Sequence, residues 1–291
     1  MKTISILDKT YICASEWDRL TPEQAVIISG AMQHFMKHSA QPDADIEDLH
    51  SNLRWHVSLA LLGITVQKFI QIREKLIQKQ GETSAIEQLA SLITRISEPI
   101  LESEKPLTRN HIPMLDWPII STNKFIGPNN LLQNLTIEEF AFADSMFMKH
   151  WQSPTEDYID GLIAILWRLK DPTADARSRE QRIPFQKHTF IEDAKIFTSL
   201  PVGTKHYIFL FYKGCRTRIE QTFTHVFSPG SGSAQKTDTS AQWTKVIASM
   251  TEKVTDLESM RKTNLWDFIG HMDGQIAQNQ KRERDAAIRK K

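Results

Sequence analysis

The chain has 291 residues, of which 40% are hydrophobic and 24% are charged. This is an ordinary globular composition, so wholesale disorder is not expected, and the length allows one large domain or two modest ones. The 36 basic and 35 acidic residues nearly cancel. The chain therefore lacks the global field that would steer nucleic acid or an acidic membrane, and any such binding must come from a local patch.

Cysteine content and hydropathy both bear on the compartment in which the protein is expected to reside. Cys13 and Cys215 lie far apart and form no thiolate motif, so neither a disulfide framework nor a thiolate zinc site is expected. Asp8 and Lys9 break the first apolar run, which is too short for the core of a signal peptide. No later apolar run approaches the roughly 20 residues that a membrane span needs. We expect a soluble, cytoplasmic protein with reduced thiols.

Helix-start signals recur along the chain. In a capping box, a Ser or Thr oxygen accepts a hydrogen bond from a helical N–H, and a Glu or Gln three residues later bonds back. Five segments fit this pattern, beginning at Thr21, Ser84, Thr136, Ser153 and Thr189. Each precedes apolar residues at spacings of three and four, which predicts a mainly α, multi-helix fold.

The predicted architecture has two helical halves joined by an irregular Pro-rich segment, with a linked C-terminal helix. Its parts are an N-terminal helical bundle (1–98), the irregular segment (99–135), a central helical domain (136–227), a flexible linker (228–240) and a C-terminal helical region with a basic tail (241–291). Segment 205–227 could be helix or strand, and helix is favoured. The charged stretch 171–182 is predicted to be an exposed loop.

The stretch "TIEEFAFADSMFMKHW", residues 136–151, sets acids and a histidine among apolar side chains. Glu139 completes the capping box, and Glu138 lies in the first turn, where the helix end is positive. A di-iron bundle needs Glu-x-x-His on its helices, but the residue three before His150 is Phe147, and Asp144 is six before it. We interpret this stretch as a packing helix.

The histidines of the N-terminal part provide one alternative. Glu47 and His50 form a single Glu-x-x-His without a second copy, whereas His34 and His38 are four apart and could share a zinc ion. A metal-dependent enzyme around His34, His38 and His50 is therefore kept as an alternative to surface histidines. No nucleophile-elbow, Walker or dinucleotide-binding string occurs. The sequence predicts no catalytic, cofactor-binding or metal site, and a protein that is not an enzyme.

The C-terminal region carries an apolar stripe at helical spacing, formed by Leu265, Ile269, Met272 and Ile276. Following a flexible linker, it could dock on its own chain or on a partner, and we take it as the candidate partner-binding site. The last eleven residues, "KRERDAAIRKK", hold six basic and two acidic side chains. A nucleic-acid-associated protein that uses this end is a further alternative.

At "SEWDRLTPEQ", "NHIPML", "GPNNLLQNLTIEEFAFAD", "YIDGLIAILWR" and "FYKGCR" the chain resembles tail-module proteins of bacteriophages and prophages, either tail-assembly chaperones or related structural components. The resemblance covers most of residues 15–250 and consists of packing motifs. It implies a non-enzymatic protein without a cofactor, which acts through protein–protein contacts in the cytoplasm of the bacterial host or within the virion. The implied partners are other tail or assembly proteins, a tape-measure protein among them, or further copies of the chain, and neither membrane nor nucleic acid. The size and the irregular middle segment depart from compact chaperones.

Overall fold

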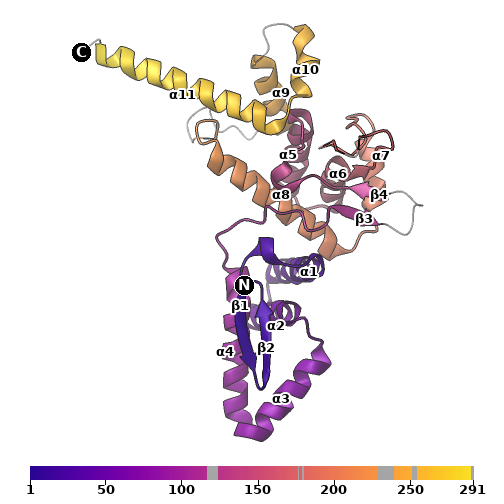
Figure 1. Cartoon of the computed structure of the whole chain (residues 1–291), viewed down its shortest axis with the longest axis vertical. Coiled ribbons are helices and arrows are strands. Elements are labelled where there is room, and N and C mark those ends of the chain that lie inside the picture. The colour runs from indigo at the N-terminus through magenta and orange to yellow at the C-terminus, as the bar shows by residue number, and fades with distance from the viewer. Residues whose placement is uncertain (117–123, 176, 179, 228–238, 251–253, 290–291) are drawn as a thin grey trace. The chain divides into compact units, whose positions relative to one another are not determined.

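The structure, a computed structural model, describes residues 1–116, 124–175, 177–178, 180–227, 239–250 and 254–289. These residues form eleven α-helices and five short strands (Figure 1), which confirms the prediction of a mainly α, multi-helix protein. They divide into two compact units: unit 1 holds residues 1–107 and 200–211, and unit 2 holds residues 108–199 and 212–291. No helix in the described ranges is both long and apolar enough to cross a membrane.

Unit 1 begins with a β-hairpin that the sequence analysis did not predict. Strands β1 (Lys2–Ile6) and β2 (Lys9–Cys13) are antiparallel and joined by a two-residue turn. Leu7 in this turn has φ 53°. Ile4, Ile6 and Cys13 are buried on one face of the hairpin, and burial raises the pKa of the Cys13 thiol. The hairpin therefore supplies one wall of the core of unit 1.

Four helices follow: α1 (Pro22–Ser39), α2 (Ile46–Leu62), α3 (Val66–Gln80) and α4 (Glu82–Leu101). Thr21 and Gln24 form both hydrogen bonds of the predicted capping box. The box predicted at Ser84 is wrong, because α4 already starts at Glu82. Gly81, with φ 84°, makes the joint between α3 and α4 there. Helix α4 also runs past residue 98 and contains Pro99.

The core of unit 1 is closed by close approaches of backbone. Helix α8 (Val202–Thr222) supplies residues to both units, and its first turn meets α1 where Gly203 lies against Gly30. A Cβ atom added at Gly203 would lie 2.8 Å from the carbonyl oxygen of Val26. This contact involves backbone on both sides, so it cannot be relieved by a side-chain rotation.

We predict that Gly203→Ala destabilises unit 1 by about 1–3 kcal/mol, the usual cost of overpacking a filled core. The measurement is thermal unfolding followed by far-UV circular dichroism. Gly274→Ala is the matched control, because a Cβ there has nothing within 4 Å and alanine is the better helix former. A Gly203→Ala protein as stable as the wild type would contradict the proposed packing.

Unit 2 combines a small sheet with helices. Strands β3 (Met114–Asp116), β4 (Lys124–Ile126) and β5 (Arg168–Leu169) form an antiparallel sheet in that order. The helices of unit 2 are α5 (Ile137–Gln152), α6 (Glu156–Leu166), α7 (Phe190–Ala194), the second half of α8, α9 (Thr239–Ser249), α10 (Leu257–Arg261) and α11 (Leu265–Arg289). Short 3₁₀ turns occupy Trp17–Arg19 in unit 1 and Asn130–Leu132, Lys195–Phe197 and Val254–Asp256 in unit 2.

Several predictions for this part need correction. The segment 99–135 contains β3 and β4 and is not wholly irregular. The capping boxes at Ser153 and Thr189 are wrong, because neither side chain caps its helix and α6 starts only at Glu156. Residues 200–211 belong to unit 1, not to the central domain. The favoured reading of 205–227 is confirmed through Thr222, where α8 ends. Residues 228–238, most of the predicted linker, lie outside the described residues.

Candidate interaction site

The base of α11 is attached by backbone hydrogen bonds to the segment that leads into α5. The N–H of Ile137 donates to the carbonyl of Thr263 at 3.0 Å, and the N–H of Leu265 donates to the carbonyl of Leu135 at 2.8 Å. These two bonds run in opposite directions across the same gap and form a short antiparallel bridge. The start of α11 is thereby fixed to the start of α5.

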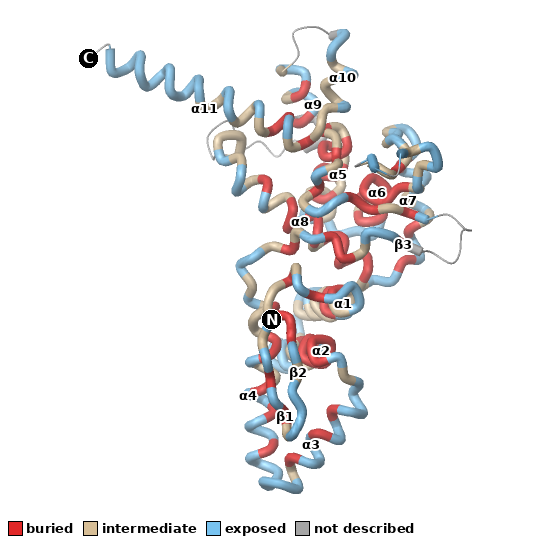
Figure 2. The backbone as a smooth tube through the Cα atoms, in the orientation of Figure 1, coloured by how far each residue is buried: buried red, intermediate tan, exposed pale blue. Residues whose placement is uncertain are grey.

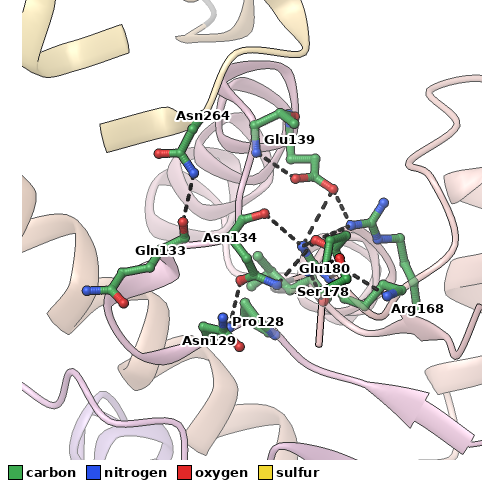
Figure 3. A network of polar contacts seen from close by, with 12 residues as sticks. Pro128, Asn129, Gln133, Asn134, Glu139, Arg168, Ser178, Glu180 and Asn264 are labelled. Carbon is green, nitrogen blue, oxygen red and sulfur yellow. Dashed lines mark hydrogen bonds and ion pairs between the residues drawn. The ribbon is translucent and has the colours of Figure 1, made fainter. Parts of the chain in front are cut away.

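Side chains reinforce this attachment. The amide of Asn264 donates to the carbonyl of Gln133 at 2.8 Å (Figure 3). The indole N–H of Trp266 donates to the carbonyl of Leu131 at 2.9 Å, and its ring packs edge-on against Phe223. Each of these bonds satisfies a carbonyl in an irregular segment that has few helical partners of its own. The base of α11 therefore stabilises residues 131–135 as well as itself.

The first two turns of α11 are packed on the rest of unit 2. Leu265, Phe268 and Ile269 are almost completely buried. The carboxylate of Asp273 accepts hydrogen bonds from the backbone N–H groups of His225 and Val226 at 2.8 and 3.2 Å. Residues 265–273 are thus a docked base.

Beyond this base the helix is solvent-exposed. Every residue from Gln278 to Arg289 is exposed, and Figure 2 shows this length of α11 in pale blue. We call residues 274–289 the arm of α11. Its charged side chains are Lys281, Arg282, Glu283, Arg284, Asp285 and Arg289. The arm carries a net positive charge and buries little apolar surface of its own.

A buried ion pair holds the start of α5, to which the base of α11 is attached. Thr136 and Glu139 form the predicted capping box, with the Glu139 carboxylate accepting from the Thr136 N–H at 2.7 Å. The other oxygen of the same carboxylate pairs with the guanidinium of Arg168 on β5 (Figure 3). Both side chains are more than nine-tenths buried. Glu139 therefore joins the helix start to the sheet.

A second arginine completes this network. Arg182 makes two hydrogen bonds to the carboxylate of Glu180, at 2.7 and 2.6 Å, and donates to the carbonyl of Leu166 at 2.9 Å. The side-chain amide of Asn134 donates to Glu180 at 3.2 Å (Figure 3), and the backbone carbonyl of Asn134 accepts from Arg182 at 3.4 Å. Asn134 adjoins the residues that hold α11, so the network and the helix base share one segment.

The formal charges of the network cancel, because Arg168 and Arg182 face Glu139 and Glu180. Burial lowers the pKa of Arg168 to about 10, against the opposing effect of Glu139, so it remains a cation at neutral pH. Burial raises the pKa of Glu180, but the hydrogen bonds and charge of Arg182 outweigh this effect and lower it overall. Arg168 and Glu180 are therefore both charged at neutral pH, in a setting where loss of one partner is costly.

Asp144, the other acid considered in α5, belongs to a separate buried cluster. Its carboxylate accepts from Arg216 at 2.6 Å, from the indole of Trp243 at 3.1 Å and from the hydroxyl of Tyr212 at 3.4 Å. Burial and the neighbouring Asp144 raise the pKa of Tyr212 well above its ordinary value. The cluster ties α5 to α8 and α9, in line with the interpretation of α5 as a packing helix.

Only part of the predicted apolar stripe of α11 is accessible on the surface. Leu265 and Ile269 are buried against unit 2, whereas Met272 and Ile276 are half-buried. The first half of the stripe thus docks on its own chain, the alternative that the sequence left open. Of the four stripe residues, only Met272 and Ile276 are accessible to a partner.

The candidate histidines of unit 1 are held in ring contacts. His34 and His38 are stacked with ring centroids 4.0 Å apart, and the ring of His50 packs edge-on against Phe35. The Nδ1 atom of His38 lies 2.8 Å from the carbonyl of His34. Within the described ranges, no group of three His, Cys, Asp or Glu side chains is placed to hold a metal ion.

Arg168 and Arg182 were not predicted as members of a buried network. Residues 171–182 were predicted to be an exposed loop, and this is wrong for Arg182, whose side chain is fully buried. Its partners come from the carbonyls of distant segments and from Glu180, only two residues before it. The Glu-x-Arg pair is a weak signal, because most such pairs on loops are solvated.

Comparison with known proteins gives no match to a family model, to a curated protein or to a solved structure.

We predict that Arg182→Met destabilises unit 2 by about 2–4 kcal/mol, because it leaves the Glu180 carboxylate and two carbonyls without their cation. The loss is smaller than for a fully buried pair, because the side chain of Glu180 is 37% exposed. Urea unfolding followed by tryptophan fluorescence measures this loss. Lys195→Met is the matched control, since Lys195 pairs with Glu192 at the same 2.6 Å separation but on the surface. It is expected to leave the midpoint nearly unchanged. Equal effects of the two substitutions would show that the buried network does not stabilise the unit.

Proposed function

We propose that the protein is a non-enzymatic component of a phage-type tail module, which acts by presenting the arm of α11 to another assembly protein. The observation that carries this proposal is a helix with a fixed base and an exposed outer length. Leu265 and Ile269 hold the base, while the arm from Gly274 onward is left for contact. The resemblance to tail-assembly chaperones and related structural components supplies the class of partner.

Two features of the chain support this reading. The buried charged groups of α5, Glu139 and Asp144, are engaged in contacts that hold the fold, which is the arrangement of a scaffold. A docked base also limits the motion of the arm, so that less conformational entropy is lost on binding than for a tethered peptide. The long helix is thus arranged to be recognised as a helix.

The charge of the arm defines the chemistry of the partner. Lys281, Arg282, Arg284 and Arg289 outnumber Glu283 and Asp285. A partner with an acidic helical surface would gain electrostatic steering and register from them. Ile276 and Met272 provide a small apolar contact at the inner end of the arm. We therefore propose that the arm binds an acidic helical segment of a tail protein. The first candidate is a tape-measure protein encoded nearby.

The test is isothermal titration of the full-length protein with the purified product of that neighbouring gene. The triple variant Lys281→Glu, Arg282→Glu, Arg284→Glu is expected to weaken binding at least about tenfold, or 1.4 kcal/mol. The control variant makes the same charge change on another exposed helix surface, at Arg73, Lys75 and Lys79 of α3. It should bind like the wild type, although both variants have the same net charge.

Three outcomes would overturn the proposal. Equal weakening by both triple variants would show a nonspecific charge effect, and unaltered binding by the arm variant would place the contact elsewhere. If the arm instead retains duplex DNA with a steep salt dependence while the tail protein does not bind, the nucleic-acid alternative is favoured.

A further inference from the structure

Unit 1 contains a pocket between β1, α3 and α4, with a volume of about 170 Å³. Its apolar lining is buried and comes from one residue of each element: Ile6, Leu76 and Leu92. Its polar lining is exposed to solvent and consists of Ser5, Gln88, Ser91 and Arg95. A cavity of about 150 Å³ holds benzene in another protein. The pocket therefore has room for a small polar group that carries a short apolar substituent.

The polar residues of α4 share one side of the helix. Gln88, Ser91 and Arg95 are three and four positions apart, so their side chains are neighbours. The side-chain oxygen of Gln88 already accepts a hydrogen bond from the amide of Gln80 at 2.6 Å, which leaves the N–H groups of Gln88 as donors. Among the described residues, the guanidinium of Arg95 has no carboxylate partner. This side of α4 is therefore rich in donors and carries an unpaired cation.

Strand β1 adds a backbone donor from the opposite wall. Ile6 and Lys9 flank the two-residue turn and form a hydrogen-bonded pair, so the next pair, Ser5 with Thr10, is not hydrogen-bonded. The N–H of Ser5 then points away from β2, to the side of β1 on which the pocket lies. No hydrogen bond to this N–H is formed by the described residues. The carbonyl of Ser5 lies on the same edge and is a single acceptor among these donors.

The charge at the pocket is positive. Of the residues that line it, only Arg95 is charged. The ammonium group of Lys2 lies close by, because it donates to the backbone carbonyl of Arg95 at 3.2 Å (Figure 1). The carboxylates on the same elements lie outside the lining: Asp8, Glu74 and Glu87 are exposed to solvent, and Glu98 faces Arg54 at 3.9 Å. Solvent screens exposed charges, so the pocket favours an anion.

The number of donors favours phosphate over carboxylate. A phosphate monoester brings three acceptor oxygens and a charge of about −1.5 to −2 at pH 7. Arginine can bind two of these oxygens with parallel hydrogen bonds, which leaves the third for the donors of Ser5 and Ser91. A carboxylate has only two oxygens and would leave some of these donors to water. The ester substituent can then cover the apolar lining.

We propose that this pocket binds a phosphate monoester with a small apolar substituent. Arg95 holds the phosphate together with the donors of Ser5, Gln88 and Ser91, and the substituent lies against Ile6, Leu76 and Leu92. The site belongs to unit 1 and does not involve the arm of α11. It therefore goes beyond the proposed function and can be tested separately from it.

The experiment titrates the full-length protein with phenyl phosphate, inorganic phosphate and benzoate at one ionic strength, and follows the protein amides by NMR. Phenyl phosphate is expected to bind with millimolar affinity and to shift the amides of Ser5, Ile6 and residues 88–95. Inorganic phosphate lacks the apolar ring, and benzoate has fewer acceptor oxygens and a smaller charge. Each should therefore bind at least about threefold more weakly than phenyl phosphate.

A first pair of variants tests the cation. Arg95→Gln should weaken the binding of phenyl phosphate at least about tenfold, because it removes the charge-assisted hydrogen bonds. Arg177→Gln makes the same charge change at an exposed position of unit 2 and should bind like the wild type.

A second pair tests the position of the site. Ser91→Asp places a carboxylate in the pocket and should abolish binding, whereas Ser51→Asp adds the same charge at an exposed position of α2 and should not. All four substituted side chains are exposed, so the variants should keep the fold, which circular dichroism checks.

Absence of saturable binding of phenyl phosphate would overturn the proposal. Equal binding of benzoate would show that the pocket selects negative charge alone, and equal binding of inorganic phosphate would remove the role of the apolar lining. Equal weakening by Arg95→Gln and Arg177→Gln, or unchanged binding by Ser91→Asp, would place the anion elsewhere. None of these results alters what the tail-protein titration is expected to show.

Discussion

Unit 2 depends on one buried carboxylate, that of Glu139, because each of its two oxygens binds a different element. One of its oxygens accepts from the backbone of Thr136 and fixes the start of α5, and the other pairs with Arg168 on β5. A buried carboxylate must be paired and hydrogen-bonded to be tolerated, so the helix start, the strand and the adjacent Glu180–Arg182 pair must form together. Leu135 and Ile137, on either side of Thr136, make the bonds to Leu265 and Thr263. The position of the start of α11 therefore depends on the same group.

The residues that stabilise unit 2 are different from those that the arm of α11 exposes to solvent. The polar network and the Asp144 cluster keep charged side chains inside unit 2, where they specify how α5, α8 and the sheet meet. The arm of α11, by contrast, carries its charges in solvent and adds little to the core. A helix with low burial of its own is more stable when its first turns are docked, because the nucleation of the helix is then already complete. A fixed base and an open arm suit a protein that works by contact.

Local signals in the sequence predicted local structure well and tertiary partners poorly. Thr21 and Thr136 were predicted as capping boxes because their partners are three residues away, and both boxes form. The same pattern at Ser84 failed, because Gly81 lets α4 begin earlier than the Ser-x-x-Glu motif indicates. Arg182 could not be placed from sequence, since its burial depends on carbonyls brought to it by folding. The stripe containing Leu265 was recognised as apolar, but periodicity alone does not say which surface covers it.

The measurement that tests the role of Glu139 most directly is amide hydrogen exchange in a Glu139→Gln variant. Glutamine retains an oxygen for the Thr136 N–H but removes the charge that Arg168 requires. If the buried ion pair holds the base of α11, the amides of Ile137 and Leu265 will exchange faster in the variant, while amides of α2 in unit 1 keep their protection. Unchanged exchange at Ile137 and Leu265, or an equal increase in both units, would contradict the dependence of the α11 base on Glu139.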